Sequence, residues 1–160
     1  MSTPRRSGAP GIIAGMETGL SFTDLQPDST ERFVALRRAL GVTTFGLNQI
    51  VLQPGERGRI HAHERQEEVF IVLEGTLTLL VDGAPTDVPV GRAVRVAPEI
   101  RRQIANLGPG RTVLIALGGA VPHDGRDGIA FADWDDTAGS PPQEIPLPEN
   151  IPAEHLRAAS

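Results

Sequence analysis

Short β-type segments separated by glycine and proline turns fill the middle of this chain, and they constrain its fold more than any other feature. Runs rich in valine, isoleucine, leucine and threonine follow one another from residue 42 to residue 118, with turns such as Pro54-Gly55 and Asp82-Gly83 between them. The chain contains 18 glycines and 14 prolines, a share that is high for a helical bundle and usual for a turn-rich β protein. The pattern predicts an all-β sandwich, barrel or jelly roll. Its expected strands cover residues 43–52, 68–74, 76–81, 93–96, 102–106 and 111–117.

The segments on either side of this β region have a different character. A chain of 160 residues has the length of a single domain, and the predicted barrel core covers residues 43–118. Residues 1–20 lack any apolar period and are expected to form a flexible leader, and residues 119–160 read as an extended, proline-rich tail. Phe131 and Trp134 are expected to dock this tail against the barrel or against a partner chain.

A short helix is predicted over residues 28–41. Asp28 and Glu31 have the spacing of a capping box, apolar residues recur at helical spacing behind them, and Gly41 ends the run. The apolar residues of this segment also fit a strand, so both structures are open here.

Composition excludes several classes of function. The chain has no cysteine, which rules out disulfides, thiolate metal sites, iron–sulfur clusters and cysteine nucleophiles. A formal net charge of −5 argues against a nucleic-acid partner, which requires a basic surface. No apolar run approaches the roughly 18 residues of a membrane span, so we expect no membrane partner and a soluble, cytoplasmic protein.

Two histidines and a glutamate form the strongest candidate for a functional site. His61 and His63 are two residues apart, so on a strand both imidazoles point to the same side and can reach one ion. Glu68 opens the next expected strand, and its carboxylate faces the same way as Phe70 and Val72, where an unpaired charge is costly. Two imidazoles and one carboxylate are a ligand set suited to Fe, Mn, Ni, Co or Zn. His123 and His155 are expected to be solvated histidines in the tail.

The stretch around these residues resembles the first motif of the cupin superfamily, G-x5-H-x-H-x4-E-x6-G. The matching residues are Gly55, His61, His63, Glu68 and Gly75. The resemblance implies a small, single-domain bacterial-type cupin: a jelly-roll barrel, or double-stranded β-helix, with its site inside the mouth of the barrel.

The second cupin motif is matched only in part. Gly91 and Asn106 stand at their expected places, and Asn106 is expected to hold a turn by side-chain hydrogen bonds. Pro98 comes one residue late, with Ala97 in the motif position, and Glu99 replaces the expected glycine. Arg102 stands where the family has its third histidine ligand, and a guanidinium has no lone pair to offer a metal.

Arg102 leaves three arrangements open. In the first, a metal sits on His61, His63 and Glu68, and Arg102 clamps an anionic substrate. In the second, Arg102 pairs with Glu68 and this pair replaces the metal. In the third, Arg102 turns to solvent and Gln103 faces the cavity, which requires a register slip or a bulge.

The favoured interpretation is a metal-binding cupin that acts on a small, anionic organic molecule as an oxygenase or isomerase. Arg102, Phe70 and Gln49 are the expected substrate-lining residues, and Gly55, Gly75, Gly91 and Asn106 are structural. The alternative is a non-catalytic small-molecule-binding or regulatory cupin in which the Arg102–Glu68 pair takes the place of the metal. The apolar outer side of the Glu68 strand, Val69, Ile71 and Leu73, predicts a homodimer.

Overall fold

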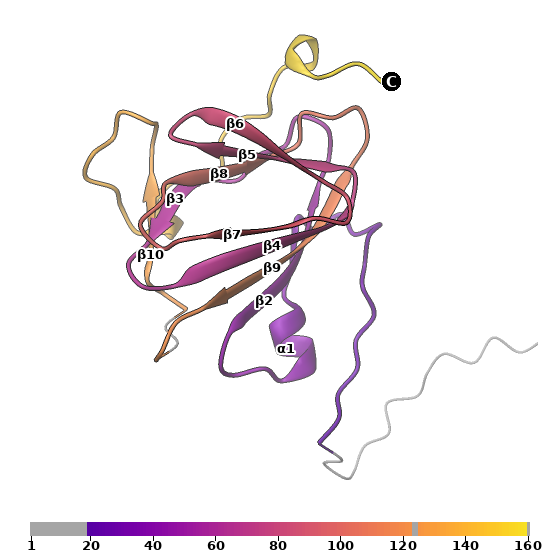
Figure 1. Ribbon diagram of the computed structural model, residues 1–160, viewed down its shortest axis with the longest axis vertical. Coiled ribbons are helices and arrows are strands. Elements are labelled where there is room, and N and C mark those ends of the chain that lie inside the picture. The colour runs from indigo at the N-terminus through magenta and orange to yellow at the C-terminus, as the bar shows by residue number, and fades with distance from the viewer. Residues whose placement is uncertain (1–18, 123–124, 160) are drawn as a thin grey trace, which may run out of the picture.

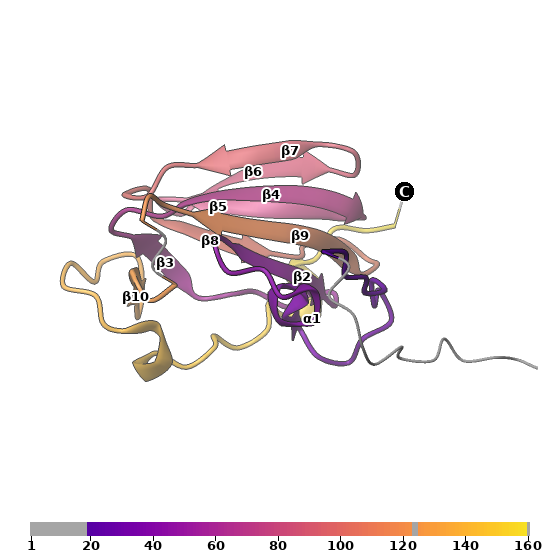
Figure 2. The ribbon, with the colours of Figure 1, turned by 90° about the horizontal axis from the view of Figure 1, so that it is seen from below.

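A computed structural model of the chain describes residues 19–122 and 125–159, so that most of the predicted leader and His123 lie outside the described residues. Two layers of antiparallel strands make up the body of the molecule (Figures 1 and 2). The elements in chain order are β1 Phe33–Val34, α1 Leu36–Leu40, β2 Gly46–Leu52, β3 Ile60–His63, β4 Glu67–Glu74, β5 Thr76–Val81, β6 Ala84–Pro89, β7 Ala93–Val96, β8 Arg102–Ala105, β9 Thr112–Gly119, β10 Gly128–Phe131 and the 3-10 turns Pro142–Glu144 and Ala153–His155.

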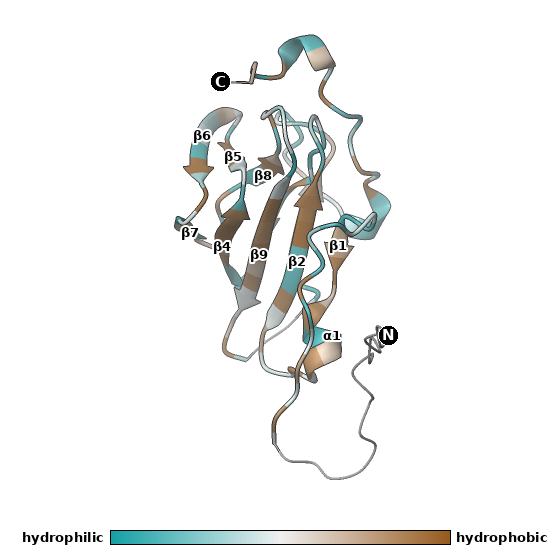
Figure 3. Ribbon diagram, turned by 90° about the vertical axis from the view of Figure 1, so that its right-hand side faces the viewer, coloured by the Kyte–Doolittle hydropathy of each residue, from teal (hydrophilic) through white to brown (hydrophobic). Residues whose placement is uncertain are grey.

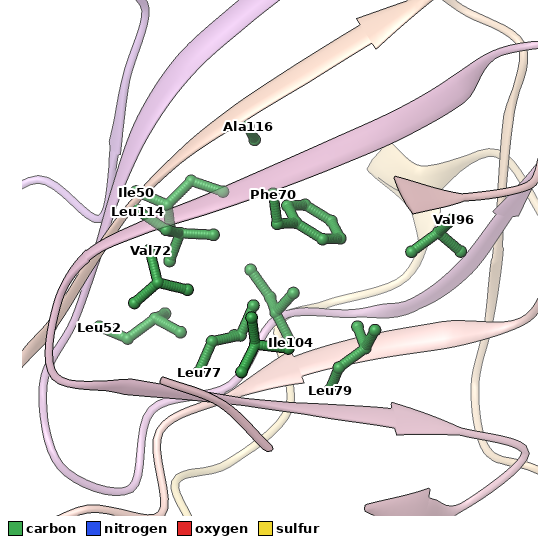
Figure 4. Close-up of a cluster of buried hydrophobic side chains, with 11 residues drawn as sticks. Ile50, Leu52, Phe70, Val72, Leu77, Leu79, Val96, Ile104, Leu114 and Ala116 are labelled. Atoms are coloured by element: carbon green, nitrogen blue, oxygen red, sulfur yellow. The ribbon is translucent and has the colours of Figure 1, made fainter. Parts of the chain in front are cut away.

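The strands form two five-stranded sheets, which confirms the predicted all-β fold. One sheet has the order β1-β2-β9-β4-β7 and the other has the order β10-β3-β8-β5-β6. Apolar side chains from the facing sides of both sheets interdigitate in a single core (Figure 4). None of the helices within residues 19–122 and 125–159 is long and apolar enough to cross a membrane.

Strand β4 shows why its sequence folds in this way. Phe70 and Val72 are buried in the core, whereas Ile71 and Leu73, which alternate with them, are 37% and 41% exposed. Alternation of side chains between a buried and an exposed face is the pattern expected of a strand with one buried side. The same alternation places Glu68 on the inner side, as the sequence predicts.

Tight turns confirm the predicted positions of several breaks. Asp82 and Gly83 join β5 to β6 with φ of 49° and 80°, the left-handed conformations that a two-residue hairpin turn requires. Gly75 has φ of +73°, and a Cβ there would lie 2.5 Å from the carbonyl oxygen of Arg111. Both conformation and space therefore require glycine at position 75.

Asn106 holds a turn with its side chain, as predicted. Its Nδ2 donates to the carbonyl oxygens of Leu52 and Gly110, both at 2.8 Å, and its Oδ1 accepts from the backbone N–H of Gly108. The amide is fully buried, so these bonds satisfy groups that would otherwise lack partners.

The predicted helix is shorter than expected. Phe33 and Val34 instead form β1, which pairs with β2, because strand pairing satisfies their backbone groups beside an existing sheet edge. The helix begins after Ala35, which provides no side-chain cap, so the predicted capping box is wrong. The predicted end is right, because Gly41 adopts a left-handed conformation and caps the helix.

The sequence pattern did not predict strand β10, which lies in the tail, or strand β6, which follows the Asp82-Gly83 turn. Strand β10 pairs with β3, and the Arg101 guanidinium lies 3.9 Å from the centre of the Phe131 ring. Arg101 also donates to the backbone oxygen of Trp134. Phe131 and Trp134 thus dock the tail against the barrel, which is one of the two predicted outcomes.

Candidate metal centre

The three candidate ligands lie where the two sheets meet at one end of the sandwich. His61 and His63 project from β3 in one sheet, and Glu68 projects from β4 in the other. The turn between β3 and β4 carries the chain from one sheet to the other, so four intervening residues suffice to bring the carboxylate opposite the imidazoles.

The geometry of this group is compact. Nε2 of His61 lies 3.3 Å from Oε2 of Glu68, and Nε2 of His63 lies 3.5 Å from Oε1. The two rings are nearly perpendicular, at 89°, with centroids 5.3 Å apart. One ligand atom from each residue lies within 4.8 Å of the other two, so the group can hold a metal ion.

Each ring also contacts an oxygen acceptor on the side away from Glu68. Nδ1 of His63 lies 2.9 Å from Oδ1 of Asp127, and Nδ1 of His61 lies 3.2 Å from the carbonyl oxygen of Arg59. A carbonyl and an ionised carboxylate only accept, so Nδ1 carries the proton in both rings. A neutral imidazole that donates through Nδ1 has its lone pair on Nε2, the atom that faces Glu68 in both residues.

Asp127 is an acceptor that sequence analysis did not identify. Its Oδ2 accepts from the backbone N–H groups of Arg65 and Gln66, in addition to the contact of Oδ1 with His63. Burial raises the pKa of Asp127, but the two backbone hydrogen bonds and His63 outweigh that effect and lower it. In the sequence this residue belongs to an Asp-Gly pair that suggests only a turn, and the pairing of β10 with β3 brings it to His63.

When both imidazoles are neutral, the Nε2 lone pairs of His61 and His63 converge with the Glu68 carboxylate. These groups repel one another unless a positive charge lies between them. The Nε2 atom of His63 is buried and, among the described residues, has no hydrogen-bond partner. A buried polar atom without a partner is costly, and either a proton shared with Glu68 or a bound cation removes that cost. The donor set therefore fits a divalent transition metal.

Arg102 points inward and pairs with Glu68. Its Nε and Nη2 lie 3.0 and 2.6 Å from Oε2 of Glu68, and its Nη1 donates to the carbonyl oxygens of Pro98 and Ile100. The side chain is 0% exposed. The arrangement with Arg102 in solvent is wrong, since Gln103 faces away and donates to the carbonyl oxygen of Gly58.

These contacts also correct the expected role of Arg102. Nε, Nη1 and Nη2 all donate to protein oxygens, and none of the side chain is accessible to a ligand. Arg102 therefore does not present its guanidinium to a substrate in this structure. It holds Oε2 of Glu68 and leaves Oε1 facing His63.

Glu68 is ionised in this setting. Burial alone raises its pKa, but the contacts of the carboxylate with His61, His63 and the Arg102 guanidinium together lower the pKa well below its ordinary value. A bound cation would act in the same direction, because it also favours the charged carboxylate.

One predicted lining residue, Gln49, does not reach the site. Gln49 points to the opposite side of β2, where its amide bonds to the backbone N–H and carbonyl of Gln26, in the segment that runs across β2 (Figure 3). Its neighbours Ile50 and Leu52 take the inner positions. Phe70 faces inward, is 2% exposed and packs in the core, and its contact with a substrate stays a prediction.

Open space adjoins the group at His63. The lining of a cavity of about 910 Å³ includes His63, Gly128, Ile129 and the loop from Ala138 to Gln143. This volume lies within the range of small-molecule sites.

The described residues thus form a β-sandwich with a group of three side chains that could hold a metal ion. Residues 48–118 match the model of the Cupin_2 family, so this part of the chain is a cupin domain. Protein SchB of Streptomyces halstedii is 24% identical over 124 residues, which cover 74% of this chain and 90% of SchB.

Solved structures agree with this assignment. A cupin protein from Bacteroides fragilis superposes with a TM-score of 0.57 at 20% identity, over 66% of this chain and 86% of the other. A sugar phosphate isomerase from a cupin superfamily, from Silicibacter pomeroyi, has a TM-score of 0.54 at 24% identity, over 72% and 79% of the two chains. At these identities the likeness shows the shared fold.

Proposed function

We propose that this cupin binds one divalent transition-metal ion through His61, His63 and Glu68 and acts on a small organic molecule as an oxygenase or isomerase. The observation that carries the proposal is the buried Nε2 of His63, which lacks a hydrogen-bond partner among the described residues and faces a carboxylate. His61 presents a second Nε2 to the same carboxylate. The ion would be Fe, Mn, Ni, Co or Zn, which all accept this ligand set.

The protein groups around the ion have separate tasks. When bound, the metal supplies a Lewis acid that polarises an oxygen atom of the substrate. Asp127 and the carbonyl of Arg59 would accept from Nδ1 and so leave both Nε2 atoms free to coordinate, and Arg102 holds Oε2 of Glu68. Three protein ligands leave coordination positions for the substrate, which would reach them through the cavity beside His63.

The second candidate is a small-molecule-binding or regulatory cupin that holds no metal. It is favoured by the two hydrogen bonds from Arg102 to Oε2 of Glu68, which compensate the buried charge without an ion. In this case a proton shared between His63 and Glu68 satisfies the imidazole.

Metal content and thermal stability separate these candidates. Protein purified without added metal is expected to contain one transition-metal ion per chain by elemental analysis. Removal of that ion with a chelator should lower the melting temperature, since a ligand present at 100 times its Kd stabilises the native state by about 2.7 kcal/mol. A metal-free protein whose melting temperature is unchanged by Fe, Mn, Ni, Co and Zn would establish the second candidate.

Asp127→Asn tests the role of the hydrogen bond behind His63. The neutral amide can present its N–H to Nδ1, and this favours the tautomer whose proton is on Nε2. We expect metal affinity to fall by roughly 10- to 100-fold, the usual effect of losing such a partner. Titration with a fluorescent metal indicator measures the metal affinity of the variant. An affinity equal to that of the wild type would contradict the assigned tautomer.

We also propose that the protein forms a homodimer. The outer side of β4 exposes Ile71 and Leu73, and Phe33 and Phe45 are further large apolar residues with substantial exposure. Association would remove this surface from water. Sedimentation at micromolar concentration is expected to yield twice the chain mass, and Ile71→Lys combined with Leu73→Lys is expected to reduce it to the monomer. A wild-type protein that sediments as a monomer would exclude this assembly.

A further inference from the structure

We infer a second ligand site, for a flat aromatic acid, between the outer face of β3 and β8 and the C-terminal strap, residues 131–148. A cavity of about 360 Å³ occupies this position, and we call it the outer pocket. Its lining residues are Arg57, Arg59, Ile60, Gln103, Phe131, Ala132, Asp133, Trp134, Ile145, Pro146, Leu147 and Pro148.

The outer pocket is separate from the candidate metal centre. Ile60 alternates with His61 along β3, and Gln103 alternates with Arg102 along β8, so the sheet lies between the two places. His61 and Arg102 are paired across the strands and face the interior with Glu68. A molecule in the outer pocket would therefore contact none of the proposed metal ligands.

Most of the pocket wall is apolar and partly aromatic. Phe131 and Trp134 contribute aromatic rings, and Ile145 and Leu147 with their neighbouring prolines contribute aliphatic groups. Arg101 packs on Phe131 and bonds to the backbone of Trp134, which holds the aromatic side in place. A cavity of this size with aromatic side chains in its wall favours flat ring systems, which can stack on those rings.

Two arginines give the pocket a positive edge. Arg57 donates through Nε to the carbonyl oxygen of Glu149, and Arg59 donates through Nε to that of Ile145, so both also hold the strap. In the described part of the chain, the Nη atoms of these arginines have neither a hydrogen-bond acceptor nor an ion-pair partner. Both side chains are half-buried, and guanidinium groups in this state favour a carboxylate, which can accept two N–H bonds.

The single carboxylate in the lining does not cancel this charge. Oδ1 of Asp133 accepts from the backbone N–H groups of Asp135 and Asp136, at 2.9 and 2.8 Å. Its one negative charge offsets one of the two arginine charges, so the lining keeps a net positive charge. The combination of an apolar slot and two cations defines the ligand class: an aromatic ring system that carries one carboxylate.

Trp134 allows a direct test, because it is the one tryptophan of the chain. We would titrate the full-length protein with 2-naphthoate and with its uncharged analogue 2-naphthamide, following Trp134 fluorescence and heat of binding. Naphthoate is expected to quench Trp134 and to bind at least about tenfold more tightly than naphthamide, a difference of about 1.4 kcal/mol. Equal affinity for the two probes, or no binding of naphthoate, would overturn the proposal.

A matched pair of variants isolates the charge. Leu147→Asp places a negative charge in the pocket wall, and Leu147→Asn is its uncharged counterpart; neither removes the arginine bonds to the strap. Naphthoate should bind more weakly to the Asp variant than to the Asn variant by several-fold, whereas naphthamide should not distinguish them. Arg57→Gln combined with Arg59→Gln should remove the preference for naphthoate. Retention of the preference in that variant would contradict the assigned anion contacts.

The proposed metal centre supplies the last control. His61→Ala combined with His63→Ala is expected to leave naphthoate binding unchanged. This variant therefore tests the outer pocket separately from the proposed function. Loss of naphthoate binding in this variant would place the ligand at the metal centre and refute the second site.

Discussion

Replacement of both His61 and His63 by alanine is expected to abolish stable metal binding. The two Nε2 atoms supply two of the three donors, and Glu68 alone, with one oxygen held by Arg102, offers a single carboxylate oxygen. Elemental analysis should detect no bound ion after dialysis, and a chelator should no longer change the melting temperature.

His155→Ala is the matched control for this experiment. His155 is exposed near the C-terminus and does not belong to the group of converging ligands, so its loss should leave metal content at the wild-type value. If the double variant retained a full complement of metal, the ion would bind elsewhere and the proposed centre would be wrong.

Arg102→Met is expected to destabilise the protein by about 3–5 kcal/mol, because the variant removes one partner of a buried pair and leaves the Glu68 charge uncompensated. Urea unfolding in the presence of chelator measures the change. Glu68→Gln combined with Arg102→Met should recover much of the loss, since both charges are then absent. A destabilisation of less than about 1 kcal/mol would show that solvent, rather than Arg102, compensates Glu68.

Arg102→His makes the converse prediction. Arg102 stands at the place of the third histidine in the cupin motif, and it lies opposite His61 across the paired strands β3 and β8. An imidazole there adds a donor and removes a positive charge from beside the ion. We expect the variant to bind metal more tightly than the wild type and to regain on metal binding the stability that it loses without metal. Weaker binding would indicate that the guanidinium supports the ion by holding Glu68.

Periodicity and turn chemistry account for what sequence analysis predicted correctly. The alternation of Phe70 and Val72 with Ile71 and Leu73, and the positive φ required at Gly75 and in the Asp82-Gly83 turn, are local properties of the chain. The spacing of His61, His63 and Glu68 is likewise local, because one strand and one turn connect them.

The errors arose where packing between distant segments decides the outcome. Gln49 lies on the outer side of β2 because the apolar residues beside it take the core positions, and the segment that contains Gln26 then covers its amide. The predicted capping box failed because strand pairing with β2 competes for the residues before α1. Neither competition leaves a signal within the segment itself.

The sequence by itself determined the all-β fold, the turns and the two-histidine, one-glutamate group, because strand period, glycine conformation and ligand spacing act over a few residues. Only the tertiary structure decided that Arg102 turns inward to Glu68, that Asp127 sets the proton on His63, and that the strap closes a pocket at Trp134. These contacts join residues far apart in the chain, and the free energy that selects them comes from burying and pairing charges across the assembled sheets.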